Sequence, residues 1–120
     1  MLTFTGEQTP HEVAQWMQQS DCFVLFSNYE NAPVVLSECL AIGLPIISSN
    51  AGGIPEMVNP ECGVLLPPQD EEALAHAMLQ MLNGEVTYHK DAIRKHANKY
   101  TFHHVGAQLA ELYRQIVHEL

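Results

Sequence analysis

The chain has 120 residues, a length that suits one compact domain with a single hydrophobic core. Apolar residues make up 47% of it, which excludes global disorder, and no apolar run approaches the ~20 residues of a membrane-spanning helix. Residues 1–6 lack the basic and apolar regions of a secretory signal peptide, so we expect a cytoplasmic protein.

Charge is distributed unevenly along the chain. The formal net charge is −9, and all five Lys and Arg residues follow residue 89. An acidic first part of this kind argues against a nucleic-acid surface. It also means that residues 1–89 can hold a phosphate only with backbone N–H groups and a helix dipole. The basic run Lys90–Lys99 predicts a solvated face, with contact to a membrane surface as the alternative.

Neither the cysteines nor the histidines have the spacing of a metal site. Cys22, Cys39 and Cys62 are separated by long gaps, and the first two lie in apolar segments, so we expect buried free thiols. His103 and His104 stand beside a helix start without a partner acid. We therefore expect neither a metal nor a cofactor.

Strand and helix patterns alternate along the chain. Short apolar or alternating runs predict four strands, at Leu2–Thr5, Cys22–Phe26, Pro45–Ser48 and Gly63–Leu66. Capping residues and helical spacing predict helices over residues 10–19, 33–42, 70–83, 86–99 and from 101 onward, with a short one after a turn at Gly52 and Gly53. This order predicts a three-layer, Rossmann-like α/β fold with a parallel sheet. So few strands favour the back half of a doubly wound domain.

Apolar residues at helical spacing mark one face of the first and the last helix. Trp16 lies on the apolar face of residues 10–19, and we expect it in the core. The last helix carries one apolar stripe, and we likewise expect its Tyr113 in the core. That stripe consists of Val105, Leu109, Leu112, Tyr113 and Ile116.

The most informative feature is a pair of glutamates, Glu30 and Glu38, on either side of a strand-to-helix turn. Ligands of open α/β sheets bind beyond the carboxyl ends of strands, where Glu30 is expected. Carboxylates accept hydrogen bonds from hydroxyls, and the free N–H groups of Val34 and Val35, after Pro33 at the first helical position, can hold an anion. A nucleotide-sugar carries both hydroxyls and an anion. The spacing by itself also fits two solvated acidic residues without a ligand.

The segment Ser27–Ile47, with Glu30 and Glu38, resembles the E-x7-E signature of retaining GT-B glycosyltransferases, in particular glycosyltransferase family 4 (glycosyl transferases group 1). Motifs on both sides of it resemble those of the family in order and spacing. They are Phe4-Thr5-Gly6, Ser20–Val24, Asn50–Glu56, Gly63–Asp70 and Tyr100-Thr101-Phe102 with Leu112-Tyr113. The resemblance implies that residues 1–120 form a single, partial domain, the latter part of the C-terminal, nucleotide-sugar-binding domain of a GT-B fold.

The resemblance also implies an activity and its residues. The parent enzyme would transfer a sugar, with retention, from a nucleotide-diphosphate sugar to a glycan or lipid-linked acceptor in cell-surface polysaccharide or glycoconjugate biosynthesis. Glu30, the catalytic position, would face the sugar hydroxyls, and Glu38 the nucleotide ribose. The backbone that meets the sugar and the distal phosphate would be that of Asn31, Ala32, Val34 and Val35. Pro33 stands where many members have Gly, which removes one N–H donor.

Two parts of the family's enzymes have no counterpart in this sequence, the acceptor domain and the basic residues that neutralise the diphosphate. We therefore expect no transferase activity from the 120 residues alone, and a parent that is cytoplasmic or peripheral at the cytoplasmic membrane face. The alternatives are a nucleotide-sugar epimerase of GT-B fold and a non-catalytic α/β interaction domain. A dinucleotide-binding domain is disfavoured because no G-x-G-x-x-G follows a strand.

Overall fold

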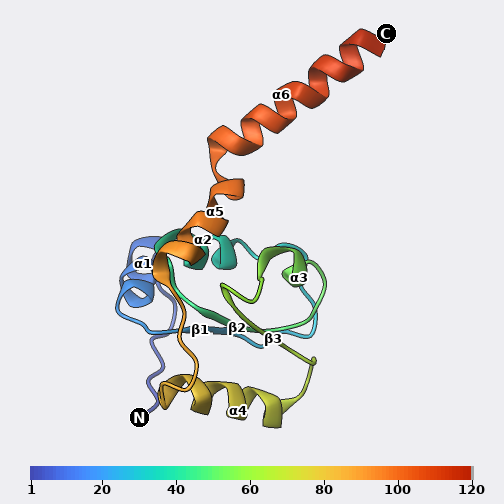
Figure 1. Ribbon diagram of the computed structural model, residues 1–120. Coiled ribbons are helices and arrows are strands. Elements are labelled where there is room, and N and C mark those ends of the chain that lie inside the picture. The colour runs from blue at the N-terminus through green and yellow to red at the C-terminus, as the bar shows by residue number, and fades with distance from the viewer. Residues whose placement is uncertain (120) are drawn as a thin grey trace.

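The computed structural model describes residues 1–119, and within them a parallel sheet of three strands lies between helices (Figure 1). The strands β1 (Phe23–Leu25), β2 (Ile46–Ser49) and β3 (Gly63–Leu66) are ordered β1-β2-β3. Ile47 of β2 pairs with Val24 on one side and with Val64 on the other. Parallel neighbours need crossover connections, which the helices provide.

Helices cover both faces of the sheet. Figure 1 shows α4 on one face and α1, α2, α3 and α5 on the other. The α-helices are α1 (Pro10–Gln18), α2 (Val34–Ile42), α3 (Ile54–Met57), α4 (Glu71–Leu82), α5 (Lys90–Ala97) and α6 (Phe102–Glu119), and a 3₁₀ helix, η1 (Asn98–Tyr100), links the last two. The predicted three-layer, Rossmann-like α/β fold is thereby confirmed.

The helix ends follow the predicted capping residues. Thr9 Oγ1 accepts from the Glu12 N–H while the Glu12 carboxylate accepts from the Thr9 N–H at 2.8 Å, which is a complete capping box. Asp70 caps α4 through the Ala73 N–H at 2.9 Å. Gly43 ends α2 with φ of 77°, a left-handed conformation that glycine adopts without strain.

The main core lies between the sheet and the helices α2, α3 and α5. Leu36 and Leu40 of α2 pack there with Ile46, Ile54 and Ile93, and all five are 0% exposed. A smaller cluster on the other face joins Ile47 and Leu66 to Ala77 of α4. Because these core contacts hold α2 on the sheet, the end of the loop that leads into α2 has a fixed position.

The predicted strand at Leu2–Thr5 is wrong. Residues 2–5 pair with no strand in the described chain, and Leu2 and Phe4 are 80% and 89% exposed. Alternation alone does not make a strand, because its N–H and C=O groups need a neighbouring strand. Several boundaries also differ from expectation. The largest difference is at α5, which begins at Lys90, and in α2 Pro33 is the N-cap and not the first helical residue.

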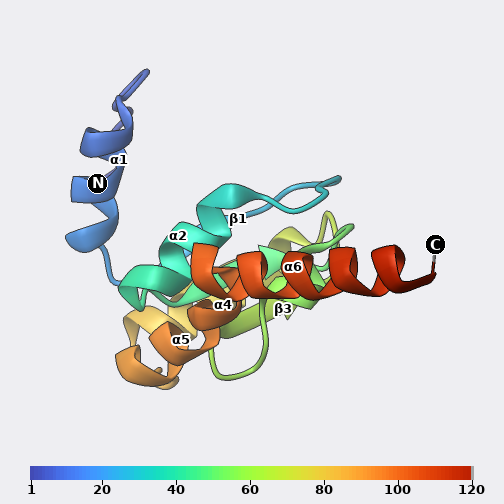
Figure 2. The same ribbon diagram turned by 90° about the horizontal axis from the view of Figure 1, so that it is seen from above.

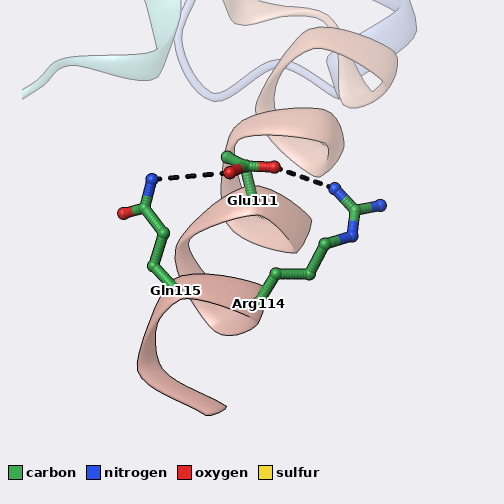
Figure 3. Close-up of polar contacts among 3 residues, drawn as sticks. All are labelled: Glu111, Arg114 and Gln115. Atoms are coloured by element: carbon green, nitrogen blue, oxygen red, sulfur yellow. Dashed lines mark hydrogen bonds and ion pairs between the residues drawn. The ribbon is translucent and has the colours of Figure 1, made fainter. Parts of the chain in front are cut away.

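The expected core positions of Trp16 and Tyr113 are also wrong, since their side chains are 51% and 65% exposed. The whole apolar stripe of α6 is exposed. Figure 1 shows why, because α6 projects away from the sheet, and in Figure 2 its end lies beyond the rest of the chain. On the polar side of α6, Glu111 accepts hydrogen bonds from Arg114 at 3.0 Å and from Gln115 at 3.4 Å (Figure 3). These contacts lie within α6 and do not attach it to the rest of the chain.

The three cysteines are free thiols, as predicted. Cys39 and Cys62 are buried and Cys22 is half-buried. Burial raises the pKa of the Cys39 thiol to about 12 and that of Cys22 to about 11. These thiols are therefore neutral packing groups at ordinary pH.

Candidate functional site

Glu30 lies in the loop that follows β1, at the carboxyl end of the sheet, where the sequence predicts it. Its side chain is half-buried, and its Oε1 accepts a hydrogen bond from the Ser27 hydroxyl at 2.8 Å. A carboxylate offers about four acceptor positions on two oxygens. One protein donor therefore leaves most of the acceptor capacity of Glu30 for a ligand.

The turn at Gly52 and Gly53 lies in contact with this loop. The Gly53 N–H donates to the Glu30 carbonyl at 3.2 Å. A Cβ built on Gly52 would lie 1.6 Å from the Glu30 oxygen, and one on Gly53 would lie 1.9 Å from the Asn31 oxygen. The sequence indicates only a turn here. The structure shows two glycines that are required because the backbone of another loop lies where their side chains would be.

Two serines at the end of β2 are functional candidates that sequence reasoning missed. Ser48 and Ser49 are 0% exposed. Ser48 Oγ donates to the Leu25 carbonyl at 2.9 Å, and Ser49 Oγ donates to the Ser27 carbonyl. The available signal was the pair of hydroxyls at the end of an otherwise apolar strand, because buried hydroxyls must find acceptors.

The N-terminus of α2 directly follows the loop that carries Glu30. Pro33 is the N-cap and gives the helix no side-chain hydrogen bond within the described residues. The first turn of a helix has N–H groups without helical acceptors, and it carries the positive end of the helix dipole. Val34 is 70% exposed and Val35 is half-buried at this end. An anion placed here would meet backbone donors.

Asn31, Ala32 and Val34 line a groove of about 510 Å³ between the start of α2, α3 and the start of α6. Lys99 and His104 also line it. Lys99 Nζ donates to the Glu56 carbonyl at 3.0 Å and lies 5.0 Å from the centre of the Tyr100 ring. Lys99, from the basic part of the sequence, therefore lines the same groove as residues of the acidic first part.

Glu38 lies apart from that groove, exposed on the second turn of α2. It lines a groove of about 450 Å³ between α1 and α2, where Val13, Ala14 and Met17 form an apolar wall. It also borders a groove of about 560 Å³ towards Arg94 of α5. The structure therefore puts Glu30 with the residues that follow it, and Glu38 on another part of the surface.

Two further observations concern metals and membranes. In residues 1–119, no group of three or more His, Cys, Asp or Glu side chains is placed to hold a metal ion. Among residues 1–119, none of the helices combines the length and the hydrophobicity that a bilayer-spanning segment requires.

Comparison with known proteins gives a consistent result. Residues 1–101 match the family model described as "Glycosyl transferases group 1". The amylovoran biosynthesis glycosyltransferase AmsK of Erwinia amylovora is 32% identical over 125 residues, which cover 96% of this chain and 31% of that protein. The D-inositol 3-phosphate glycosyltransferase of Corynebacterium urealyticum is 29% identical over 118 residues, 96% of this chain and 28% of that protein. The chain thus spans about a third of the length of these relatives.

Solved structures show the same similarity. Sucrose-phosphate synthase from Thermosynechococcus elongatus superposes with a TM-score of 0.84 at 30% identity, over 98% of this chain and 31% of that one. The apo form of the lipopolysaccharide outer core galactosyltransferase WaaB shares the fold, with a TM-score of 0.76 at 24% identity over 95% of this chain and 32% of that one. The structural neighbours are GT-B glycosyltransferases, which agrees with the Rossmann-like fold described above. Because the family model covers most of the chain, this protein belongs to the glycosyl transferases group 1 family.

Proposed function

We propose that residues 1–120 are the latter part of the nucleotide-sugar-binding domain of a retaining GT-B glycosyltransferase. The enzyme would move a sugar from a nucleotide-diphosphate donor to a glycan or lipid-linked acceptor. The observation that carries this proposal is the loop after β1, residues 26–33, which carries Glu30 and leads to a helix start without a side-chain cap. The name of the amylovoran relative supports a role in polysaccharide biosynthesis.

In this proposal Glu30 is the residue that meets the donor sugar. Its unoccupied carboxylate positions accept hydrogen bonds from the sugar hydroxyls. The backbone of Asn31 and Ala32 approaches the sugar, and that of Val34 and Val35 the distal phosphate. Pro33 carries no N–H, so this enzyme has one donor fewer at that point than a relative with Gly.

Glu38 holds the ribose hydroxyls in this proposal, on the far side of the phosphates. The groove between α1 and α2 that Glu38 lines suits the nucleoside by its chemistry. Its wall of Val13, Ala14 and Met17 offers an apolar surface to the flat face of a base, while Glu38 supplies a polar anchor. We infer that the donor extends from the Glu30 loop along α2 to this groove.

Catalysis in such a site depends on position and electrostatics. Residues that hold the sugar and the diphosphate in a reactive geometry remove much of the entropic barrier. The start of α2 stabilises the charge that grows on the departing diphosphate. Neither a metal nor a cofactor has a role in this scheme. Further cations for the diphosphate would come from the parts of a full-length enzyme that this chain does not span, so we expect the 120 residues alone to be inactive.

The test uses a chain in which these residues are joined to the remaining two thirds of a relative such as the amylovoran glycosyltransferase. Calorimetric titration with a panel of nucleotide-sugars should give binding of one donor that Glu38→Ala weakens. Glu72→Ala, an exposed glutamate in α4 on the other face of the sheet, is the matched control and should bind normally. No binding by a folded chimera would favour the non-catalytic alternative, and release of epimerised sugar without acceptor would favour an epimerase.

We also propose that the parent enzyme works in the cytoplasm and touches the membrane face through α5. Lys90, Arg94 and Lys95 are exposed on this helix, in a protein that is otherwise acidic. Each Lys or Arg near an anionic bilayer contributes about 1 kcal/mol. Sedimentation with phosphatidylserine vesicles should fall when Arg94 and Lys95 are both replaced by Gln, and unchanged sedimentation would dismiss the contact.

A further inference from the structure

We propose that Ser27 is a positioning residue for Glu30, and that Ser49 holds Ser27 in place for that purpose. The proposal rests on the proposed function, in which the Glu30 carboxylate meets the donor sugar. It assigns a role to two residues that do not touch the donor themselves.

The side chains of Ser27 and Glu30 are in direct contact. The Ser27 hydroxyl donates to Oε1 of Glu30 at 2.8 Å, and a hydrogen bond to an ionised acceptor is stronger than one between neutral groups. Only Oε1 is engaged in the described structure. Ser27 can therefore fix the direction of the carboxylate while Oε2 remains available to sugar hydroxyls.

The backbone of Ser27 is itself held by β2. The paired part of β1 ends at Leu25, which is in register with Ser48. Beyond that point the chain leaves the sheet, and serine hydroxyls of β2 replace the backbone ladder. Ser48 donates to the Leu25 carbonyl and Ser49 to the Ser27 carbonyl. Both hydroxyls are fully buried, so their hydrogen bonds are not exchanged for water.

The backbone of Glu30 is held as well, by the turn after β2. Gly53 N–H holds the Glu30 carbonyl at 3.2 Å, so the backbone is fixed at residue 30 as well as at residue 27. Between these points the Ser27 hydroxyl fixes the side chain. A glutamate in a loop otherwise loses rotamer freedom when the donor binds. Protein contacts that restrict the Glu30 side chain before the donor binds reduce this entropy loss and favour the reactive geometry.

The experiment compares Ser27→Ala, Ser27→Cys and Ser27→Thr in the chimera described above. Alanine and cysteine remove the strong donor, and threonine keeps a hydroxyl. We expect kcat to fall about tenfold or more in the Ala and Cys variants with a small change in donor KM, since a displacement near 1 Å at a reacting group costs up to about a hundredfold. The Thr variant should recover most of kcat. Ser20→Ala, an exposed serine after α1, should behave as the unmodified chain.

Two readouts separate positioning from plain stability. Binding of the nucleotide diphosphate without sugar should be unchanged in Ser27→Ala, because that ligand does not reach Glu30. In a Glu30→Gln background, Ser27→Ala should cause little further loss of kcat, which is the coupling expected of residues that act as a unit. Equal loss of nucleotide and nucleotide-sugar binding, or full additivity with Glu30→Gln, would overturn the proposal.

The outcomes also distinguish this proposal from the proposed function. If the unmodified chimera transfers sugar and Ser27→Ala and Ser27→Cys transfer it equally fast, only the role of Ser27 is lost. If the folded chimera neither binds nor transfers any donor, the proposed function fails and the positioning role with it. If Ser27→Ala does not fold, the Cys and Thr variants decide, because neither of them removes side-chain volume.

Discussion

Gly52 lies against the backbone of Glu30, so close that a Cβ on Gly52 would stand 1.6 Å from the Glu30 carbonyl oxygen. Gly52 also has φ of 53°. We expect Gly52→Ala to lower the free energy of unfolding by about 3 kcal/mol or more, since either the turn or the Glu30 loop must move. Denaturant unfolding of the 120-residue chain measures this.

The matched control is Gly84→Ala. Gly84 has φ of 69°, but nothing lies within 4 Å of its added Cβ. That substitution should cost only the strain of the left-handed conformation, about 1–2 kcal/mol. Equal losses in the two variants would show that the close approach to Glu30 contributes nothing.

His96 joins α5 to the segment after α3. Its Nε2 lies 3.0 Å from the Met57 carbonyl, which fixes Nε2 as the donor, and its Nδ1 then accepts from the Asn59 amide at 3.2 Å. We expect His96→Ala to cost about 1–3 kcal/mol, because both bonds are partly buried. Thermal unfolding measures the loss. His76→Ala, an exposed histidine in α4, should stay within about 0.5 kcal/mol of the unmodified chain.

The buried thiols give a dependence of stability on alkaline pH. The pKa of Cys39 is raised from 9.0 to about 12, so the unfolded thiol ionises first. Between these two values the folded state binds more protons, and stability falls as pH rises. Below pH 9 the contribution is complete. We expect the fall in stability from pH 9 to pH 11 to be smaller in Cys39→Ala, as measured by urea unfolding at each pH.

Thiol labelling gives an independent check on the same burial. A neutral buried thiol reacts slowly with a disulfide reagent. In the folded chain we expect Cys39 to be modified only at the rate of unfolding. In the chain unfolded by urea we expect it to be modified at once. Rapid labelling of Cys39 in the folded chain at pH 8 would contradict the burial.

The apolar stripe of α6 should contribute little to the stability of this chain. Leu109 and Tyr113 are 48% and 65% exposed. We therefore expect Leu109→Gln and Tyr113→Gln to change the free energy of unfolding by less than about 0.5 kcal/mol. Ile93→Ala, on α5 and 0% exposed, should cost about 2–5 kcal/mol in the same denaturant titration. A large loss in the α6 variants would mean that the stripe packs after all.

Several features of this protein follow from short stretches of its sequence. Thr9, Gly43 and Asp70 mark helix ends correctly, because a cap depends on residues three or four positions away. The short apolar runs at Cys22–Phe26, Pro45–Ser48 and Gly63–Leu66 contain β1, β2 and β3, in a sheet with helices on both faces. The place of Glu30 also follows, since a loop after a parallel strand opens at the ligand-binding edge of the sheet.

Other features depend on contacts between distant residues, which no local pattern contains. Residues 2–5 have a strand pattern but no neighbouring strand, and Tyr113 has a core pattern but no surface to pack on. The contacts of Ser49 with Ser27 and of Gly53 with Glu30 join segments more than twenty residues apart in the chain. Local sequence thus determined the capped helix ends and the three apolar strands, because capping and periodicity are short-range. Only the tertiary structure decided what supports Glu30, because that support consists of hydrogen bonds and close approaches between different loops.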